Sequence, residues 1–135
     1  MVLGPGCLNY SFVFSLEERP LWHNVRRSVC EILGRIAEPL GAEVRGSSDL
    51  VWQGRKMSGN SQRRIGGALL HHGTLLYRFD AELAERYLLE PVRQPEYRQR
   101  RTHAEFLGNL PYSPREIQRR VAETWGAGLY SENDR

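Results

Sequence analysis

The residues with the clearest chemical potential form a polar run at alternate positions, Lys56, Ser58, Asn60 and Gln62, within RKMSGNSQRR. Side chains alternate between the two faces of a strand, so this spacing predicts that all four share one face. At about 3.3 Å per residue the run is roughly 20 Å long, which suits an extended polar ligand. Gly59 removes a side chain where a ligand or another backbone could come close. A solvated edge strand fits the same pattern, because exposed edges need polar side chains.

The histidine pair and the two cysteines are the other reactive residue types. His71 and His72 are adjacent in ALLHHGTLL, and adjacent strand residues face opposite ways, so no metal site is predicted for them. Each imidazole could instead satisfy only a backbone carbonyl. Cys7 and Cys30 are too few for a disulfide framework and lack metal-ligand spacing, so reduced thiols are expected. For Cys7, beside a Gly-Pro-Gly turn, a small buried residue is favoured over a nucleophile.

Three consecutive strands are expected to hold these side chains. DLVW, which starts at Asp49, is apolar and β-prone, and Gln53-Gly54 predicts a two-residue hairpin turn after it. RKMSGNSQRR runs back, and Gly66-Gly67 turns into ALLHHGTLLYRF. This last segment is apolar on both faces around the histidines, which predicts a buried, central strand. A polar strand beside a buried one indicates a lined groove.

The remaining segments predict supports for this sheet. LNYSFVFSL, residues 8–16, is typical of a strand. Apolar residues then recur at three- and four-residue spacing over residues 22–40, which predicts an amphipathic helix of about five turns. This helix is expected to begin between Ser15 and Pro20 and to stop at Gly41. Shorter elements are expected at 43–45 (strand), 81–89 (helix capped by Asp80), 103–107 (one or two helical turns) and from Pro114 onward (helix capped by Ser113).

The composition is typical of a soluble single-domain protein. A chain of 135 residues, 40% hydrophobic and 26% charged, can bury one core. Its apolar runs are far shorter than a membrane span and its start lacks a signal-peptide pattern, so we expect a cytoplasmic protein without membrane contact. The formal net charge is +3, and residues 93–101, RQPEYRQRR, hold four arginines and a tyrosine. Because this run is short and lacks a nucleic-acid module, we expect a solvated loop or a patch for an acidic protein, and no nucleic-acid partner.

Two neighbouring segments resemble the central motif of the lipoate-protein ligase family in order and spacing. They are DLVWQGRKMSGNSQRR and, after it, ALLHHGTLL. Weaker similarity in GPGCLNYS and YRQRRTH extends the resemblance over nearly the whole chain. The resemblance implies that Lys56 contacts the carboxyl carbonyl and the phosphate of an acyl-adenylate, a role that suits a fixed ammonium. Five further residues would shape the same site: Asp49, Ser58, Gly59, His72 and Gly73.

The resemblance also implies a fold and a reaction. The fold would be α+β, like class II synthetases and biotin/lipoate ligases, with a mixed, mainly antiparallel sheet and packed helices. Residues 1–130 would form a partial catalytic domain and residues 131–135 a disordered tail. Lipoate and ATP with Mg²⁺ would form lipoyl-adenylate, and a lysine of an acceptor protein would then attack the carbonyl. The expected acceptors are the lipoyl domains of 2-oxoacid dehydrogenase complexes or the glycine cleavage H protein.

One family motif is missing from the front of the sequence. An Arg-Arg-x-Ser/Thr-Gly-Gly-Gly stretch precedes, in that family, the position at which this chain has Met1. A fragment, a domain completed by a second polypeptide or by another copy of the chain, and a truncated non-catalytic binding domain remain open interpretations. The alternative enzyme is an octanoyl or lipoyl acyltransferase that needs no ATP. Related transferases carry a nucleophilic cysteine where this chain reads EVRGSSD, so only Cys7 or Cys30 could serve, and ATP-dependent activation is favoured.

Overall fold

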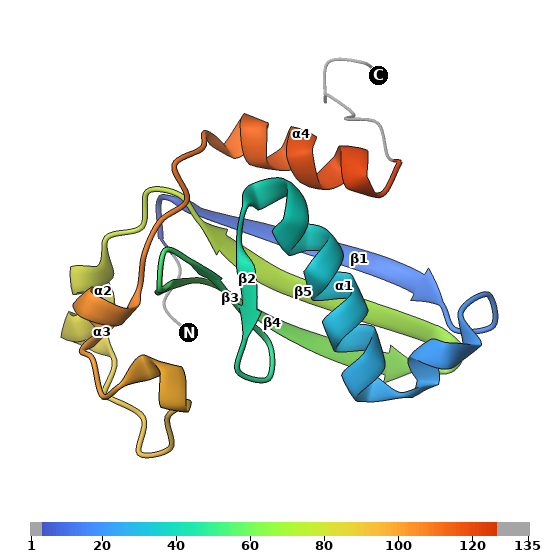
Figure 1. The fold of residues 1–135 in the computed structure, drawn as a ribbon, viewed down its shortest axis with the longest axis horizontal. Helices are drawn as coiled ribbons and strands as arrows, with labels where there is room; N and C mark the ends of the chain where they lie inside the picture. The colour runs from blue at the N-terminus through green and yellow to red at the C-terminus, as the bar shows by residue number, and fades with distance from the viewer. Residues whose placement is uncertain (1–3, 127–135) are drawn as a thin grey trace.

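A five-stranded sheet in the order β1-β5-β4-β3-β2 forms the centre of the fold (Figure 1). This computed structural model describes residues 4–126, so the tail predicted at 131–135 lies outside the described residues. All the described strand pairs are antiparallel, and a single parallel bridge joins Lys56 to Leu107. The predicted α+β class is confirmed. The strands are β1 (Cys7–Ser15), β2 (Glu43–Arg45), β3 (Asp49–Trp52), β4 (Arg55–Ile65) and β5 (Ala68–Leu76).

Two tight turns connect β3, β4 and β5, as the sequence predicts. Gln53 and Gly54 both adopt positive φ, 50° and 76°, which matches the twist that a two-residue hairpin requires. Gly66, with φ of 56°, begins the second turn. As expected, β5 is a central strand, between β1 and β4. However, the face of β5 that carries His72 is less buried than predicted, because His72 is exposed.

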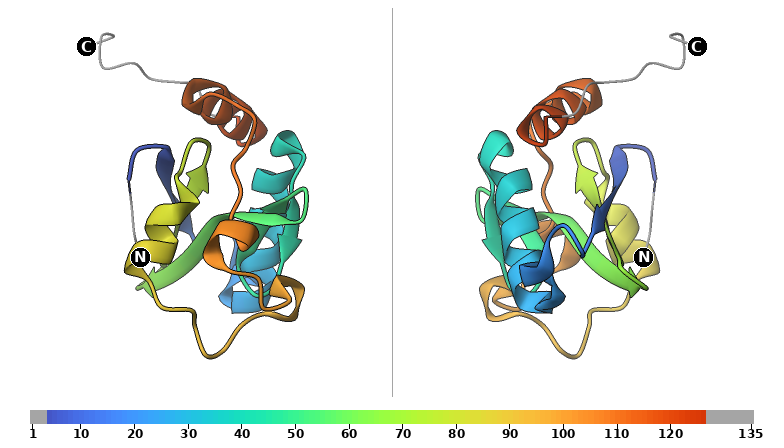
Figure 2. Two further views of the ribbon diagram at one scale, coloured as in Figure 1. Left: turned by 90° about the vertical axis from the view of Figure 1, so that its left-hand side faces the viewer. Right: turned by 90° about the vertical axis from the view of Figure 1, so that its right-hand side faces the viewer.

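The helices divide into two groups. They are η1 (Pro20–His23), α1 (Val25–Leu40), α2 (Ala81–Tyr87), η2 (Glu96–Arg98), α3 (His103–Phe106) and α4 (Pro114–Thr124). Figure 1 shows α1 lying across the sheet with α4 alongside it, and Figure 2 shows α2 on the opposite side of the sheet from α1. Each helix in the stretch 4–126 is too short or too polar to cross a membrane.

The core lies between α1, α4 and one face of the sheet, which we call the helix face. Alternate residues of β1 and β5 point into it, including Phe14, Leu69 and Leu75. Ile36 of α1 and Ile117 of α4 are fully buried opposite them. The other face, which we call the open face, is covered only at one end, by α2, α3 and the segment between them.

The start of the long helix differs from the prediction. The backbone N–H of Glu18 does donate to Ser15 Oγ at 3.4 Å, but only the short 3₁₀ helix η1 follows, from Pro20 to His23. The helix α1 begins after Asn24, whose extended backbone interrupts the preceding η1 turn and whose side-chain oxygen accepts a hydrogen bond from Arg27 N at 2.9 Å. At the other end, Gly41 takes φ of 67° and stops α1, as predicted.

Candidate active site

A β-bulge in β4 sets the position of Lys56. Leu50 of β3 pairs with Ser58, but the next residue, Val51, pairs with Lys56, so Met57 is an extra residue in the ladder. An extra residue of this kind breaks the alternation of side chains along the bulged strand. As a result, Lys56 points to the open face, whereas Ser58 shares the helix face with Leu50.

The bulge brings together residues that simple alternation would separate. Asp49 pairs with Gly59 on the open face, and Lys56 Nζ lies 3.0 Å from Asp49 Oδ1. A Cβ atom on Gly59 would lie 3.6 Å from Lys56 Nζ, so the glycine leaves the space around the ammonium open. The prediction that Lys56 shares a face with Ser58, Asn60 and Gln62 is therefore wrong, because it assumed an unbroken strand.

Tyr97 holds the other oxygen of the Asp49 carboxylate. The Tyr97 hydroxyl donates to Asp49 Oδ2 at 2.6 Å. Burial, together with the hydrogen bond to Asp49 and the charge of that carboxylate, raises the pKa of Tyr97 above its usual value. The phenol therefore stays protonated and remains a donor. Asp49 is thus fixed from one side by Tyr97 and from the other by Lys56.

Two cavities meet at Lys56. One, which we call the apolar pocket, has a volume of about 380 Å³, and the other, the polar cleft, about 420 Å³. Both are lined by Lys56, Gly59 and Thr74, so they adjoin at these residues. Lys56 therefore lies where a cavity lined mainly by apolar residues meets one lined mainly by polar residues.

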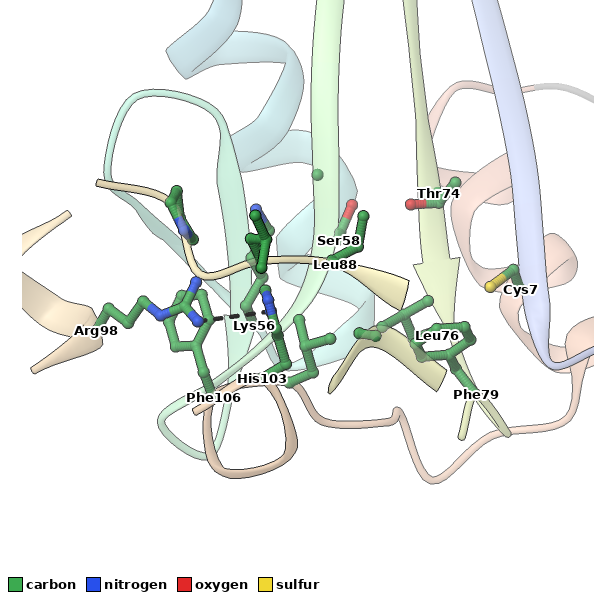
Figure 3. Close-up of a pocket in the computed structure, with 15 residues that line it drawn as sticks. Cys7, Lys56, Ser58, Thr74, Leu76, Phe79, Leu88, Arg98, His103 and Phe106 are labelled. Atoms are coloured by element: carbon green, nitrogen blue, oxygen red, sulfur yellow. Dashed lines mark hydrogen bonds between the residues drawn. The ribbon is translucent and has the colours of Figure 1, made fainter. Parts of the chain in front are cut away.

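The two cavities differ in their walls. Figure 3 shows the apolar pocket, with Lys56, Arg98 and His103 on one side and Cys7, Leu76 and Phe79 on the other. Its apolar walls come from β5 and from the segments around α2 and α3. The polar cleft lies on the open face of the sheet, and its walls are Asn9, Tyr10, Ser11, Ser48, Asp49, Lys56, Gly59, Asn60, Ser61, His72, Gly73 and Thr74.

The rest of the polar run forms a partly buried hydrogen-bond network, and Asn60 and Gln62 also line a separate cavity of about 810 Å³ beside α1. Gln62 Nε2 lies 3.1 Å from His71 Nδ1, and Tyr10 Oη lies 3.0 Å from His71 Nε2. Tyr10 also donates to the side-chain oxygen of Asn60, and the Gln62 oxygen lies 2.8 Å from the hydroxyl of Ser28 in α1. Burial lowers the pKa of His71 to about 4, with a smaller contribution from the charge of His72. This network ties β1, β4 and β5 to α1 beneath the open face.

Comparison with known proteins decides the family. The model of the lipoyl protein ligase A/B catalytic domain matches residues 1–118. The chain belongs to this family. A curated relative, lipoate-protein ligase LplJ of Bacillus subtilis (strain 168), is 35% identical over 74 residues, which are 53% of this chain and 22% of that protein. The chain therefore spans about a fifth of the length of this lipoyl ligase.

Solved structures of ligases share the fold of this lipoyl protein ligase A/B domain. Lipoate-bound LipL1 of P. falciparum superposes with a TM-score of 0.64 at 17% identity, over 89% of this chain and 34% of the other. A bipartite lipoate protein ligase of Thermoplasma acidophilum, described together with its E2 lipoyl domain, gives a TM-score of 0.63 at 19% identity, over 95% of this chain and 55% of the other. Biotin protein ligase of Aquifex aeolicus gives 0.58 at 16% identity, over 90% and 52%. The fold is therefore that of the lipoate and biotin ligases.

All six residues that the sequence analysis assigned to the site line one of the two cavities of this ligase domain. Lys56 and Gly59 line both cavities, Ser58 lines the apolar pocket, and the polar cleft is lined by Asp49, His72 and Gly73. Position 73 requires a glycine, because a Cβ atom there would lie 2.1 Å from the side-chain oxygen of Asn60.

Sequence reasoning missed Tyr97, Arg98 and His103. The run RQPEYRQRR was interpreted as a solvated loop or a partner patch, but Arg98 is only 4% exposed and Tyr97 reaches Asp49. The tyrosine among four arginines was the available signal, and it did not specify which side chains turn inward. Cys7 lines the apolar pocket, whereas Cys30 is exposed.

Proposed function

We propose that this domain binds the acyl chain of lipoate in the apolar pocket and activates its carboxyl group as an adenylate at Lys56. The observation that carries the proposal is the position of the Lys56 ammonium where the apolar pocket meets the polar cleft. An acyl-adenylate has an apolar chain joined through one mixed anhydride to a polar nucleotide. Its anhydride would therefore lie at Lys56, with the chain on one side and the nucleotide on the other.

The chemistry requires a cation at that junction. In the first step the carboxylate oxygen attacks the α-phosphorus of ATP, pyrophosphate leaves, and negative charge develops on the phosphate oxygens. In the second step the amine of an acceptor lysine attacks the acyl carbon, its proton is lost, and AMP leaves. A fixed ammonium stabilises the developing charge in both steps, and Asp49 and Tyr97 hold it in place.

The relatives support the proposed substrates and the proposed partner. Structures that share this fold contain lipoate in one case and ATP in another, which supports these two as substrates. The bipartite ligase described together with its E2 lipoyl domain supports a lipoyl acceptor domain as partner. Within residues 4–126, no group of three or more His, Cys, Asp or Glu could hold a metal ion, and Asp49 is already bound by Lys56 and Tyr97. Magnesium would therefore come with the triphosphate, and we assign it no ligand in this chain.

The composition of the chain allows a direct test of ligand binding. Lys56 is the single lysine of the sequence, since every other basic side chain of its Lys and Arg set is arginine. Reductive methylation with ¹³C-formaldehyde would label Lys56 and the N-terminal amine alone. Octanoate and lipoate should shift the Lys56 signal in NMR spectra and leave the N-terminal signal in place. The Asp49→Asn variant, which releases the ammonium, should change the position of the Lys56 signal before any ligand is added.

Transfer is tested separately, by the intact mass of an apo lipoyl domain incubated with the chain, lipoate, ATP and Mg²⁺. The proposal expects a lipoyl mass increment that requires ATP and is lost in Lys56→Ala. Lys56→Arg should fail as well, because a planar guanidinium cannot replace a compact ammonium at the junction. Absence of any Lys56 signal shift with either acid would contradict the proposal at the binding step.

One alternative enzyme, an acyltransferase that needs no ATP, has to be tested because of the position of Cys7. Cys7 lines the apolar pocket, so a thiol is available to accept an acyl group from a carrier protein without ATP. Such a transferase would show an acyl increment on Cys7 when supplied with octanoyl carrier protein alone. The ligase proposal expects no such increment, and it expects Cys7→Ser to retain transfer with ATP.

A further inference from the structure

Arg98 is a buried cation without an anionic partner. Its side chain lines the apolar pocket, and the residue is 4% exposed. It forms no ion pair with any aspartate or glutamate in the described part of the chain. Nε donates to the carbonyl oxygen of Arg101 at 3.0 Å, and the guanidinium lies over the Phe106 ring at 4.7 Å. Buried cations in proteins are normally paired, so the remaining donors of this guanidinium are suited to a ligand oxyanion.

His103 offers a second donor at the same place. The residue is 7% exposed, and its Nδ1 lies 3.5 Å from Arg98 Nη2. Because arginine can only donate, Nδ1 accepts, which places the proton of a neutral imidazole on Nε2. Nε2 is buried and has no hydrogen-bond partner among residues 4–126. Figure 3 shows His103 and Arg98 on the same side of the pocket as Lys56.

The backbone around Arg98 is held in an uncommon conformation. Gln99 and Arg100, the next two residues, both adopt positive φ, 52° and 57°, which residues other than glycine rarely do. Reciprocal hydrogen bonds close this turn, since Arg101 Nε donates to the carbonyl oxygen of Arg98 at 3.0 Å. Such conformations persist where surrounding contacts enforce them, and they are frequent at ligand-binding sites. Here the turn directs Arg98 inward, while Tyr97 beside it reaches Asp49.

We infer that Arg98, with His103 beside it, is the oxyanion-binding group of the apolar pocket. It binds the head of the acyl ligand, which is a carboxylate before activation and carries a phosphate afterwards. Lys56 and Arg98 thereby contact the same head group from one side of the pocket, and Arg98 selects acids over neutral molecules with the same chain. This inference rests on the proposed function, because it assumes that the acyl chain occupies the apolar pocket.

The test compares ligands that share a chain or an anion. Octanoate and octanol have the same chain but differ in charge, and AMP supplies the phosphate and its nucleoside without an acyl chain. By isothermal titration, Arg98→Gln should weaken octanoate binding roughly tenfold or more, as expected for a lost charge-assisted hydrogen bond, and leave octanol within about twofold. A comparable loss for AMP would show that Arg98 also serves the phosphate, and unchanged AMP binding would assign it to the carboxylate only.

Arg93→Gln is the matched control. Arg93 belongs to the same arginine-rich segment, but it is exposed and does not line the apolar pocket. It should leave octanoate binding unchanged. If Arg98→Gln does not fold, Arg98→Lys replaces it in the test, because lysine retains the charge but loses the planar pair of donors. Arg98→Lys should weaken octanoate binding at least threefold without affecting octanol binding.

The outcomes separate the two proposals. Equal losses for octanoate and octanol in Arg98→Gln would mean that Arg98 only supports the packing of the pocket, and would overturn the inference. Unchanged octanoate binding in Arg98→Gln would overturn it as well, while the proposed function stands. If the unmodified protein binds neither octanoate nor octanol, the proposed function itself fails.

Discussion

Asp49 and Lys56 form an ion pair because Met57 is an extra residue in β4: Asp49 Oδ1 lies 3.0 Å from Lys56 Nζ, across a ladder that skips Met57. A carboxylate that contacts the central cation competes with an anionic ligand for it. The role of Asp49 is therefore to orient the Lys56 ammonium where the two cavities meet, and not to increase the affinity for the ligand.

The first prediction follows from this competition. Asp49→Asn keeps an acceptor for Tyr97 but removes the negative charge beside Lys56. Octanoate should bind at least as tightly as before, while the rate of acyl transfer should fall roughly tenfold or more, because the ammonium is no longer held in place. Titration and single-turnover kinetics measure the two quantities. Glu43→Gln, which removes an exposed partner of Arg45, is the control; parallel losses of binding and rate in Asp49→Asn would contradict the orienting role.

The second prediction concerns two glycines with opposite surroundings. Gly73→Ala would place a Cβ atom 2.1 Å from Asn60 Oδ1 and 2.7 Å from the backbone oxygen of Gly59, so the free energy of unfolding should fall by about 2–3 kcal/mol or more. Gly34 lies within α1 and has nothing within 4 Å of such an atom. Gly34→Ala should therefore raise the free energy of unfolding by roughly 0.5–1 kcal/mol. Urea unfolding of both variants checks the signs, and a stable Gly73→Ala protein would refute the packing described for Asn60.

The third prediction is a pH dependence that originates at His71. Burial lowers the pKa of His71 to about 4, below its usual 6.5, so the unfolded chain binds more protons than the folded one between these values. The stability contribution of His71 is therefore fully present above about pH 6.5 and is lost as the pH falls toward 4, by up to about 3 kcal/mol. Urea unfolding from pH 4 to 7.5 should show this slope. Compared with the unmodified chain, His71→Gln should flatten this slope, whereas His72→Gln, which removes only the smaller contribution to the lowered pKa, should reduce it slightly.

The fourth prediction uses the two cysteines as reporters. In a Cys30→Ser variant, octanoate should slow the reaction of Cys7 with a maleimide, because Cys7 lines the pocket that the ligand fills. In the reciprocal Cys7→Ser variant, the exposed Cys30 should react at the same rate with and without octanoate. Mass spectrometry over a time course gives both rates. Equal protection of the two thiols would indicate a general stabilisation of the fold instead of occupancy of the pocket.

Local sequence patterns predicted the strands and turns because each has a local cause. Gln53-Gly54 can adopt the positive φ that its hairpin requires, and Asp80 and Ser113 cap the helices that follow them, as expected. The predicted start of α1 is wrong because Asn24 caps the helix within the stretch of periodic apolar residues. Hydrophobic periodicity alone does not reveal such a cap.

The geometry of the site was harder to predict. The bulge at Met57 depends on how two strands pair, and the inward direction of Arg98 depends on a turn closed by its own neighbours. Neither has a signature in hydrophobic spacing. The resemblance of its motif assigns Lys56 to the site whichever face of the strand it occupies, and Lys56 lines both cavities. Its contact with an acyl-adenylate stays a prediction.

The order of the strands also has a consequence for how the chain folds. The ladder from β3 through β4 to β5 uses tight turns and can form locally. By contrast, α1, β2, β3 and β4 separate β1 from its partner β5 in the sequence. Loop closure of that length is slow, so β1 should join the sheet after the main barrier has been crossed. Substitutions in β1 would then accelerate unfolding with little effect on the folding rate, whereas substitutions in the β4–β5 hairpin would slow folding. The cavity walls contributed by β1, Cys7 among them, would be the last to assemble.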